Sequence, residues 1–95
     1  MIKSIMYHKV EDFDIWKKAF DGFSGIRKSS GEKSFSVGTI HNEPNTAYVI
    51  NEWESEEMLK AFLGNPDLAE AMKTSGVLEA PHTLILSEHE NGSLS

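Results

Sequence analysis

His8 is the residue of this sequence whose type and position best suit proton transfer. It lies near the end of an apolar-rich segment, residues 2–10, that predicts a strand, and it shares a strand face with Met6. Histidine changes charge near neutral pH because its reference pKa is about 6.5, so a histidine at a sheet-lined pocket can move protons. We predict His8 as a catalytic acid–base residue. A hydrogen-bonded histidine at a strand edge, without a catalytic role, is the alternative.

The remaining histidines are less well placed. His82 follows Pro81 at the start of the last predicted strand and is expected close to residues 2–10 in space, which makes it a further ligand-binding candidate. His41 adjoins a predicted turn, and His89 lies near the end of the chain. No two of the four histidines are two, three or four residues apart, so the local spacing of metal sites is missing. We therefore expect no metal site within one chain, and leave open a site shared between two subunits.

Two acidic clusters could also do chemistry. Asp12 and Asp14 are close enough for acid–base work, but an N-cap followed by a first-turn carboxylate explains both. The segment EWESEE (52–57) brings four carboxylates, without the loop spacing and central glycine of a calcium site. It fits a strand end and a solvated helix start. The sequence contains neither a glycine-rich phosphate loop nor a Gly-x-Ser-x-Gly motif.

Charge and composition narrow the class of protein. The formal net charge is −6 over 95 residues, and no basic stripe is present, so we expect no nucleic-acid partner. No apolar run approaches the roughly 20 residues of a membrane span, so no membrane partner is expected. The start of the chain lacks the pattern of a secretory signal, and cysteine is absent. Together these features predict a cytoplasmic protein.

Hydrophobic periodicity predicts the elements that must position these residues. Alternation of apolar side chains predicts four strands, over residues 2–10, 32–41, 46–53 and 82–89, with a turn at 42–45. An apolar stripe predicts one helix from Asp12 to about residue 28, carried by Phe13, Trp16, Phe20 and Phe23. Ser55 is expected to cap a second helix, which Gly64-Asn65-Pro66 interrupts before a further piece over 67–74. Residues 1–90 form a single domain, and 91–95 a flexible tail.

The order of these elements is βαββαβ, which predicts an α+β, ferredoxin-like fold: a four-stranded antiparallel sheet with helices on one face. Both sides of two strands are apolar, since Ala47 and Val49 oppose Tyr48 and Ile50, and Ile85 opposes its two leucine neighbours. Helices on one face leave the second apolar face without a cover. We therefore expect a homodimer that packs sheet on sheet.

With this architecture the chain resembles the dimeric α/β-barrel superfamily, and within it the small antibiotic-biosynthesis monooxygenase-like proteins. The resemblance covers nearly the whole chain and is carried by HKVEDFDIWKKAFD (8–21), VINEWESEEMLKAFLGNPDLAEAM (49–72) and GVLEAP (76–81). Members oxidise aromatic polyketides without metal or flavin, degrade haem, isomerise or bind. The resemblance thus marks the fold better than the reaction.

The resemblance also bears on cofactors. In haem-degrading relatives a strand-end tryptophan is followed by a catalytic tryptophan and then a histidine; those positions match Trp53, Phe62 and Met72 here. The asparagine that those enzymes carry in the first strand is missing as well, so no cofactor is expected. The metal-free oxygenases imply instead a pocket with polar and aromatic groups. Asn51 and Trp53 suit that pocket because alternate strand residues share a face.

We therefore expect a small-molecule-binding dimer, with a cavity between each sheet and its helices or at the dimer interface. It would bind, and as an enzyme oxidise or rearrange without a cofactor, a small cyclic or aromatic compound. In that reading His8 is the acid–base group, Asn51 orients a carbonyl or hydroxyl, Trp53 stacks on the ligand, and His82 is the weaker ligand-binding candidate. The alternative is a non-enzymatic ligand-binding or structural dimer module.

Overall fold

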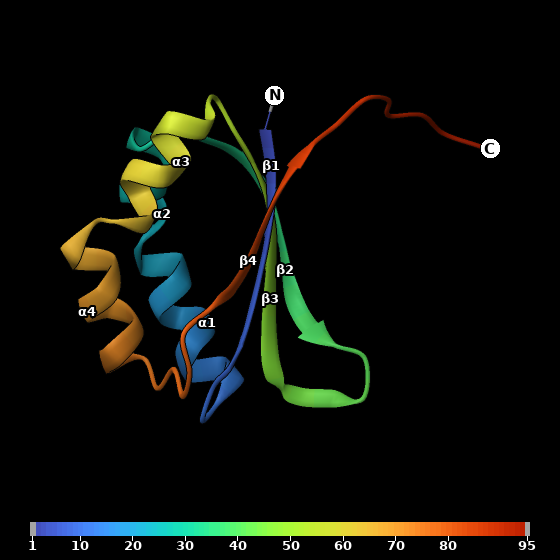
Figure 1. Cartoon of the computed structure of the whole chain (residues 1–95). Coiled ribbons are helices and arrows are strands. Elements are labelled where there is room, and N and C mark those ends of the chain that lie inside the picture. Colours follow the sequence, from blue (N-terminus) through green and yellow to red (C-terminus); the bar gives the residue numbers. More distant parts are fainter. Residues whose placement is uncertain (1, 95) are drawn as a thin grey trace.

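The protein folds as a four-stranded antiparallel sheet with four helices on one of its faces (Figure 1). The computed structural model describes residues 2–94. The strands are paired in the order β2-β3-β1-β4, with bounds β1 Ile2–Lys9, β2 Glu32–Ile40, β3 Glu43–Trp53 and β4 His82–Ser87. The helices are α1 Phe13–Gly22, α2 Ser24–Ser29, α3 Glu56–Leu63 and α4 Pro66–Thr74. The α+β ferredoxin-like fold predicted from the sequence is confirmed.

Side-chain caps begin the helices where the sequence predicts them. The Asp12 carboxylate accepts a hydrogen bond from the Ile15 backbone N–H at 3.2 Å, at the start of α1. The Ser55 hydroxyl accepts one from the Met58 N–H at 3.1 Å, at the start of α3. Each cap satisfies a backbone donor that a helix start leaves unpaired.

The first helical region is broken, where the sequence predicts one continuous helix. The break falls at Phe23, whose φ of −89° and ψ of 0° separate α1 from α2. Gly22 and Gly25 flank it, and glycine loses more backbone entropy in a helix than any other residue. Helix α2 follows the break, and its Arg27 is buried.

The hairpin between β2 and β3 is tighter than predicted. Ile40 already pairs with Glu43, so the reversal needs only residues 41 and 42 in place of the predicted turn at 42–45. Asn42 has a φ of +65°, and asparagine adopts this left-handed conformation more readily than most side chains. At the other end of the chain β4 ends at Ser87, two residues before the predicted end.

Alternation along the strands separates a covered face from an open one. Ala47, Val49 and Trp53 of β3 are buried beneath the helices, whereas Ile50 of the same strand is 37% exposed. The open face is apolar across three strands: it carries Ile5, Tyr7, Tyr48, Ile50, Leu84 and Leu86. The apolar character of both faces that the sequence predicts is therefore present in the structure.

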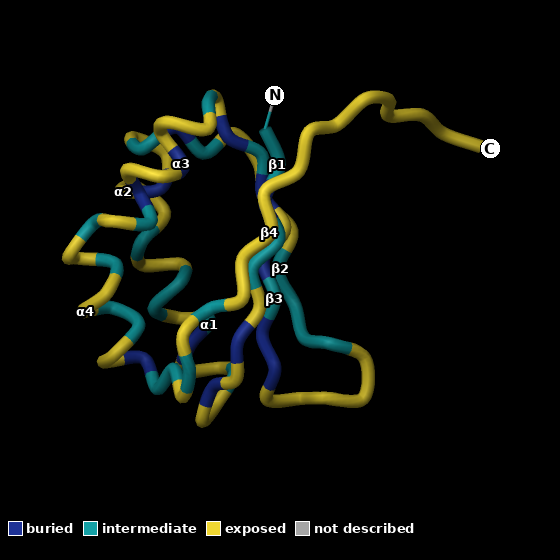
Figure 2. The backbone as a smooth tube through the Cα atoms, viewed as in Figure 1, coloured by how far each residue is buried: buried dark blue, intermediate teal, exposed yellow. Residues whose placement is uncertain are grey.

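The segment after β4 has no regular secondary structure. Residues 88–94 are exposed and lead away from the sheet, as do the exposed residues of the hairpin tip (Figure 2). Residues 1 and 95, which the sequence assigns to the domain and to the tail, lie outside the described residues. Among the described residues, no helix combines the length and the apolar character that crossing a membrane takes.

Candidate functional site

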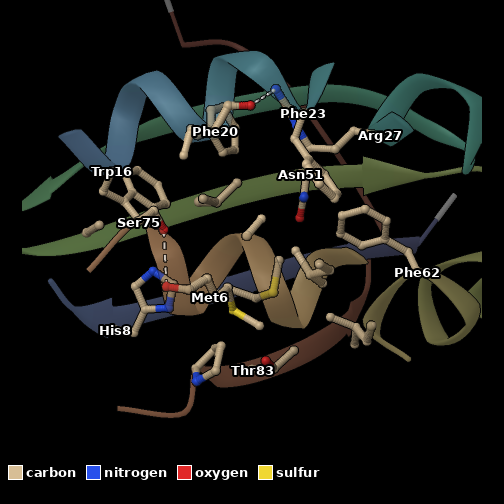
Figure 3. A pocket seen from close by; sticks show the side chains of 18 residues that line it. Met6, His8, Trp16, Phe20, Phe23, Arg27, Asn51, Phe62, Ser75 and Thr83 are labelled. Atoms are coloured by element: carbon tan, nitrogen blue, oxygen red, sulfur yellow. Dashed lines mark hydrogen bonds between the residues drawn. The ribbon is translucent and has the colours of Figure 1, made fainter. Parts of the chain in front are cut away.

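A cavity of about 280 Å³ lies between the covered face of the sheet and the helices. Its walls are mainly apolar and aromatic, and the polar side chains among them are His8, Arg27, Asn51, Ser75 and Thr83. Figure 3 shows His8 and Ser75 at one end of the cavity and Arg27 and Asn51 at the other. An apolar cavity with a few convergent polar groups is typical of a small-molecule site.

His8 reaches the cavity from β1 and is buried, with 7% of its surface exposed. The edge of its ring meets Trp16 of α1, with centroids 5.6 Å apart and planes at 86°. Its Nδ1 is buried without a hydrogen-bond partner among residues 2–94. Burial lowers the pKa of His8 below its ordinary value, and the negative charge of Glu79 opposes this shift only in part. The imidazole is therefore neutral near pH 7 and able to accept a proton.

A chain of buried hydrogen bonds holds Asn51 at the other end. The Ser4 hydroxyl donates to Asn51 Oδ1, and Asn51 Nδ2 donates to Glu32 Oε2 at 2.7 Å. Ser4 in turn accepts from Trp53 Nε1 at 3.2 Å. Both ends of the amide are thus fixed, which sets its orientation and leaves its second N–H without a hydrogen bond to residues 2–94.

Arg27 completes this polar end from α2. Its guanidinium forms a salt bridge with Glu32, and both side chains are 5% exposed. The guanidinium carbon also lies 3.7 Å from the ring centre of Phe20 and 4.9 Å from that of Phe35, so aromatic faces stack on the charge. Arg27 Nε is buried, and within the described part of the chain it has no hydrogen-bond partner.

Of the four predicted site residues, the structure brings two into the cavity. His8 and Asn51 line it. Trp53 is fully buried behind Asn51, where it packs on Phe62 with ring centres 5.1 Å apart and does not line the cavity. The ring of Trp53, which the sequence suggests would stack on a ligand, packs instead on the protein's own Phe62.

His82 lies outside the cavity, on the open face of the sheet. It pairs with Tyr7 in the β1–β4 ladder, and the two rings stack at 4.7 Å. Its Nε2 is 3.2 Å from a Glu79 carboxylate oxygen. The next residue, Thr83, points into the cavity instead, because consecutive strand residues face opposite sides. The structure thus separates His82 from His8 although their strands are neighbours.

Sequence reasoning missed Arg27, Glu32 and Ser4. Each residue has a local explanation: Arg27 is a charge near a helix end, Glu32 a polar residue at a strand start, and Ser4 a serine in a strand. Their side-chain partners are 5 to 49 positions away. Phe62 and Met72, matched by resemblance to a catalytic tryptophan and histidine, both line the cavity. No group of three potential metal-ligating histidine, cysteine or acidic side chains occurs in residues 2–94.

The fold and the cavity define a ferredoxin-like α+β protein with a small-molecule-sized site between sheet and helices. No protein-family model and no curated protein matches the sequence. Solved structures do match the fold. An antibiotic biosynthesis monooxygenase superposes with a TM-score of 0.74 at 10% identity, covering 95% of this chain and 100% of the other.

Two further structures extend this comparison. SnoaB, a cofactor-independent oxygenase from Streptomyces nogalater, has a TM-score of 0.76 at 8% identity and covers 95% and 94% of the two chains. The ActVA-Orf6 monooxygenase of Streptomyces coelicolor, in complex with the ligand Nanaomycin D, has a TM-score of 0.68 at 15% identity and covers 99% and 92%. This chain therefore has the fold of antibiotic biosynthesis monooxygenases, as the sequence resemblance implies.

Proposed function

We propose that this protein binds a small cyclic or aromatic compound in the cavity and acts on it without a cofactor, with His8 as the acid–base group. The observation that carries the proposal is the buried His8 Nδ1, unpaired among the described residues, in the wall of an apolar cavity. A buried polar atom without a partner costs free energy. A ligand hydroxyl at this position removes that cost.

The chemistry follows from the two ends of the cavity. Neutral His8 accepts a proton from a hydroxyl group of the ligand, and the anion so formed is the electron-rich form that reacts with oxygen or rearranges. At the opposite end the remaining Asn51 N–H donates to a ligand oxygen and orients the ring. The apolar walls keep water away from the reacting form. SnoaB is described as a cofactor-independent oxygenase, which supports this class of reaction by analogy of fold.

A non-enzymatic ligand-binding module is the second candidate. It is favoured by the polar end of the cavity, where Asn51 and Glu32 already pair with protein groups and are held rigidly. Such an end suits recognition as well as it suits chemistry. The two candidates share the ligand and differ in whether His8 converts it.

Native mass spectrometry of protein purified from its own cells tests the shared claim. We expect a small-molecule adduct that disappears in Ala71→Phe, which fills the cavity from α4, and persists in Ala69→Phe, which lies exposed on the same helix. An adduct that survives Ala71→Phe would place the ligand elsewhere. Absence of any adduct, together with no binding of added aromatic compounds, would contradict the proposal.

Turnover of the adduct compound separates enzyme from binding module. His8→Ala is expected to abolish oxygen consumption or rearrangement while leaving the ligand bound, because the proton acceptor alone is lost. His41→Ala, at the exposed hairpin turn, is the matched control and should keep full activity. Turnover unchanged in His8→Ala would remove His8 from the mechanism, and no turnover in the unmodified protein would favour the binding module.

The proposed assembly is a homodimer in which two open sheet faces pack on each other. On that face Leu84 is 56% exposed, Tyr7 39%, and Ile50 and Leu86 each 37%. These side chains are contiguous across β1, β3 and β4, and a contiguous exposed apolar face marks an interaction site. Twofold symmetry is the commonest way for one chain to cover such a face. The cytoplasmic location stays a prediction, which cell fractionation tests.

A further inference from the structure

The buried pair Arg27–Glu32 bears on which ligands the cavity admits. Arg27 is the one lysine or arginine among the described residues that line the cavity, and Glu32 lies directly behind it in a salt bridge. Glu32 also accepts a hydrogen bond from Asn51, so one carboxylate organises both groups that face the ligand at this end.

We propose that Glu32 makes the cavity selective for uncharged, oxygen-bearing ring compounds and against carboxylates, with Arg27 Nε and Asn51 as the donors that recognise the ligand oxygen. This inference rests on the proposed function, since it concerns the ligand of the same cavity. It adds the charge class of the ligand and names the residue that sets it.

The unpaired Nε carries the first step. Arg27 lines the cavity and is 4% exposed, and its Nε is buried without a hydrogen-bond partner among the described residues, while the other guanidinium nitrogens donate to Glu32 and, at 3.3 Å, to the Phe20 carbonyl. Arginine keeps its proton in proteins, so Nε can only donate. The free donor therefore calls for an oxygen acceptor on the ligand.

The charge balance carries the second step. Arg27 and Glu32 neutralise each other, so a ligand carboxylate would bring a buried negative charge that no group of opposite sign compensates. Only the Arg27 side chain would separate the ligand carboxylate from the Glu32 carboxylate, and the two negative charges would repel each other. At the other end of the cavity His8 is neutral and supplies no positive charge. A carbonyl or a neutral hydroxyl meets the same donors without this cost.

Paired probes test the inference by isothermal titration calorimetry. Near pH 7 the hydroxyl of 1-naphthol is neutral, as phenols titrate at about 10, whereas 1-naphthoate is an anion. We expect the unmodified protein to bind 1-naphthol at least about tenfold more tightly than 1-naphthoate. Glu32→Gln leaves Arg27 uncompensated and should reverse this preference. Glu57→Gln, exposed on α3, removes the same charge far from the pair and should leave the preference unchanged.

Each outcome decides one point. If 1-naphthoate binds the unmodified protein as tightly as 1-naphthol, the inference is wrong while the cavity proposal stands. If Glu32→Gln is folded and keeps the original preference, Glu32 does not set the ligand class. If neither probe binds, the cavity proposal itself fails. A Glu32→Gln protein that does not fold, as judged by circular dichroism, leaves the comparison of the two probes on the unmodified protein to decide.

Discussion

His8 and Asn51 lie at opposite ends of the cavity and are held in different ways. His8 is fixed by packing against Trp16, and no hydrogen bond to the described residues restrains its Nδ1. Asn51 is fixed by hydrogen bonds to Ser4 and Glu32. A residue held by packing alone keeps its polar atoms available for a reaction, whereas one held by a hydrogen-bond network is better suited to orienting a ligand.

His8 should make stability depend on pH. Burial holds its pKa in the folded protein below the ordinary value of 6.5 that applies in the unfolded chain. As pH falls through about 6.5 the unfolded chain therefore binds the proton first, so the free energy of unfolding decreases, and the decrease ends below the folded-state pKa. Chemical denaturation between pH 7.5 and 5 measures this slope. His8→Leu should flatten it.

The control for this slope is His41→Gln, a change at an exposed histidine outside the core. It should keep the pH dependence of the unmodified protein. An equal slope in His8→Leu and in the unmodified protein would show that other groups govern stability in this range.

At the scale of elements, two local departures from regular geometry shape the site. The break at Phe23 separates α1 from α2, whose Arg27 stacks on Phe20 and forms a salt bridge with Glu32 at the start of β2. The tight turn at Asn42 starts the β2–β3 hairpin, and a register shift between Thr39 and Ile40 then places Phe35 opposite Asn51. Arg27 and Glu32, five positions apart, meet Asn51, which is 19 positions after Glu32.

Asn42 offers a test of the second departure. Its φ of +65° is a conformation that β-branched side chains strongly disfavour. Asn42→Val should lower the free energy of unfolding by about 1–2 kcal/mol, whereas Asn42→Gly should be neutral or slightly stabilising. His41→Val, at the neighbouring exposed position, is the control and should change little. Equal stability of the two Asn42 variants in urea denaturation would contradict the strained turn.

At the scale of the whole molecule, four helices cover one side of the sheet and leave the other to solvent or to a partner (Figure 1). The cavity lies on the covered side, and the apolar face proposed for dimerisation lies on the other. The proposed binding of a ligand and the proposed association of two chains therefore involve opposite faces of one sheet. A substitution on one face can be studied without altering the other.

Leu84→Glu should therefore convert the dimer to a monomer. Leu84 is 56% exposed on the open face, where it pairs with Ile5 from the edge strand β4, so a charge there is tolerated in a free chain but is buried without a partner in the proposed dimer. Leu78→Glu, at a leucine that is 60% exposed but lies outside the sheet, should leave the dimer intact. Sedimentation velocity distinguishes the two species. A monomer in the unmodified protein would refute sheet-on-sheet packing.

Local patterns in the sequence were sufficient for the order of elements and for the helix starts. Asp12 and Ser55 cap α1 and α3 as predicted, because a cap depends on residues three positions apart. The βαββαβ order follows from apolar periods of two and of about 3.6, which are also local. The predicted and observed bounds of the elements differ where the backbone conformation of one residue sets the boundary, as at Phe23 and Asn42.

The tertiary structure alone decided which strand face lines the cavity. Asn51 and Ile50 are neighbours in one strand, so their side chains lie on opposite faces of the sheet in any register. Only the packing of the helices determines that Asn51 is covered and Ile50 exposed. The same packing put His82 on the open face and assembled Arg27 and Glu32 beside Asn51. A period-two pattern shows that a strand has two faces but does not show which face the helices cover. A buried ion pair depends on distance in space, which spacing along the chain does not encode.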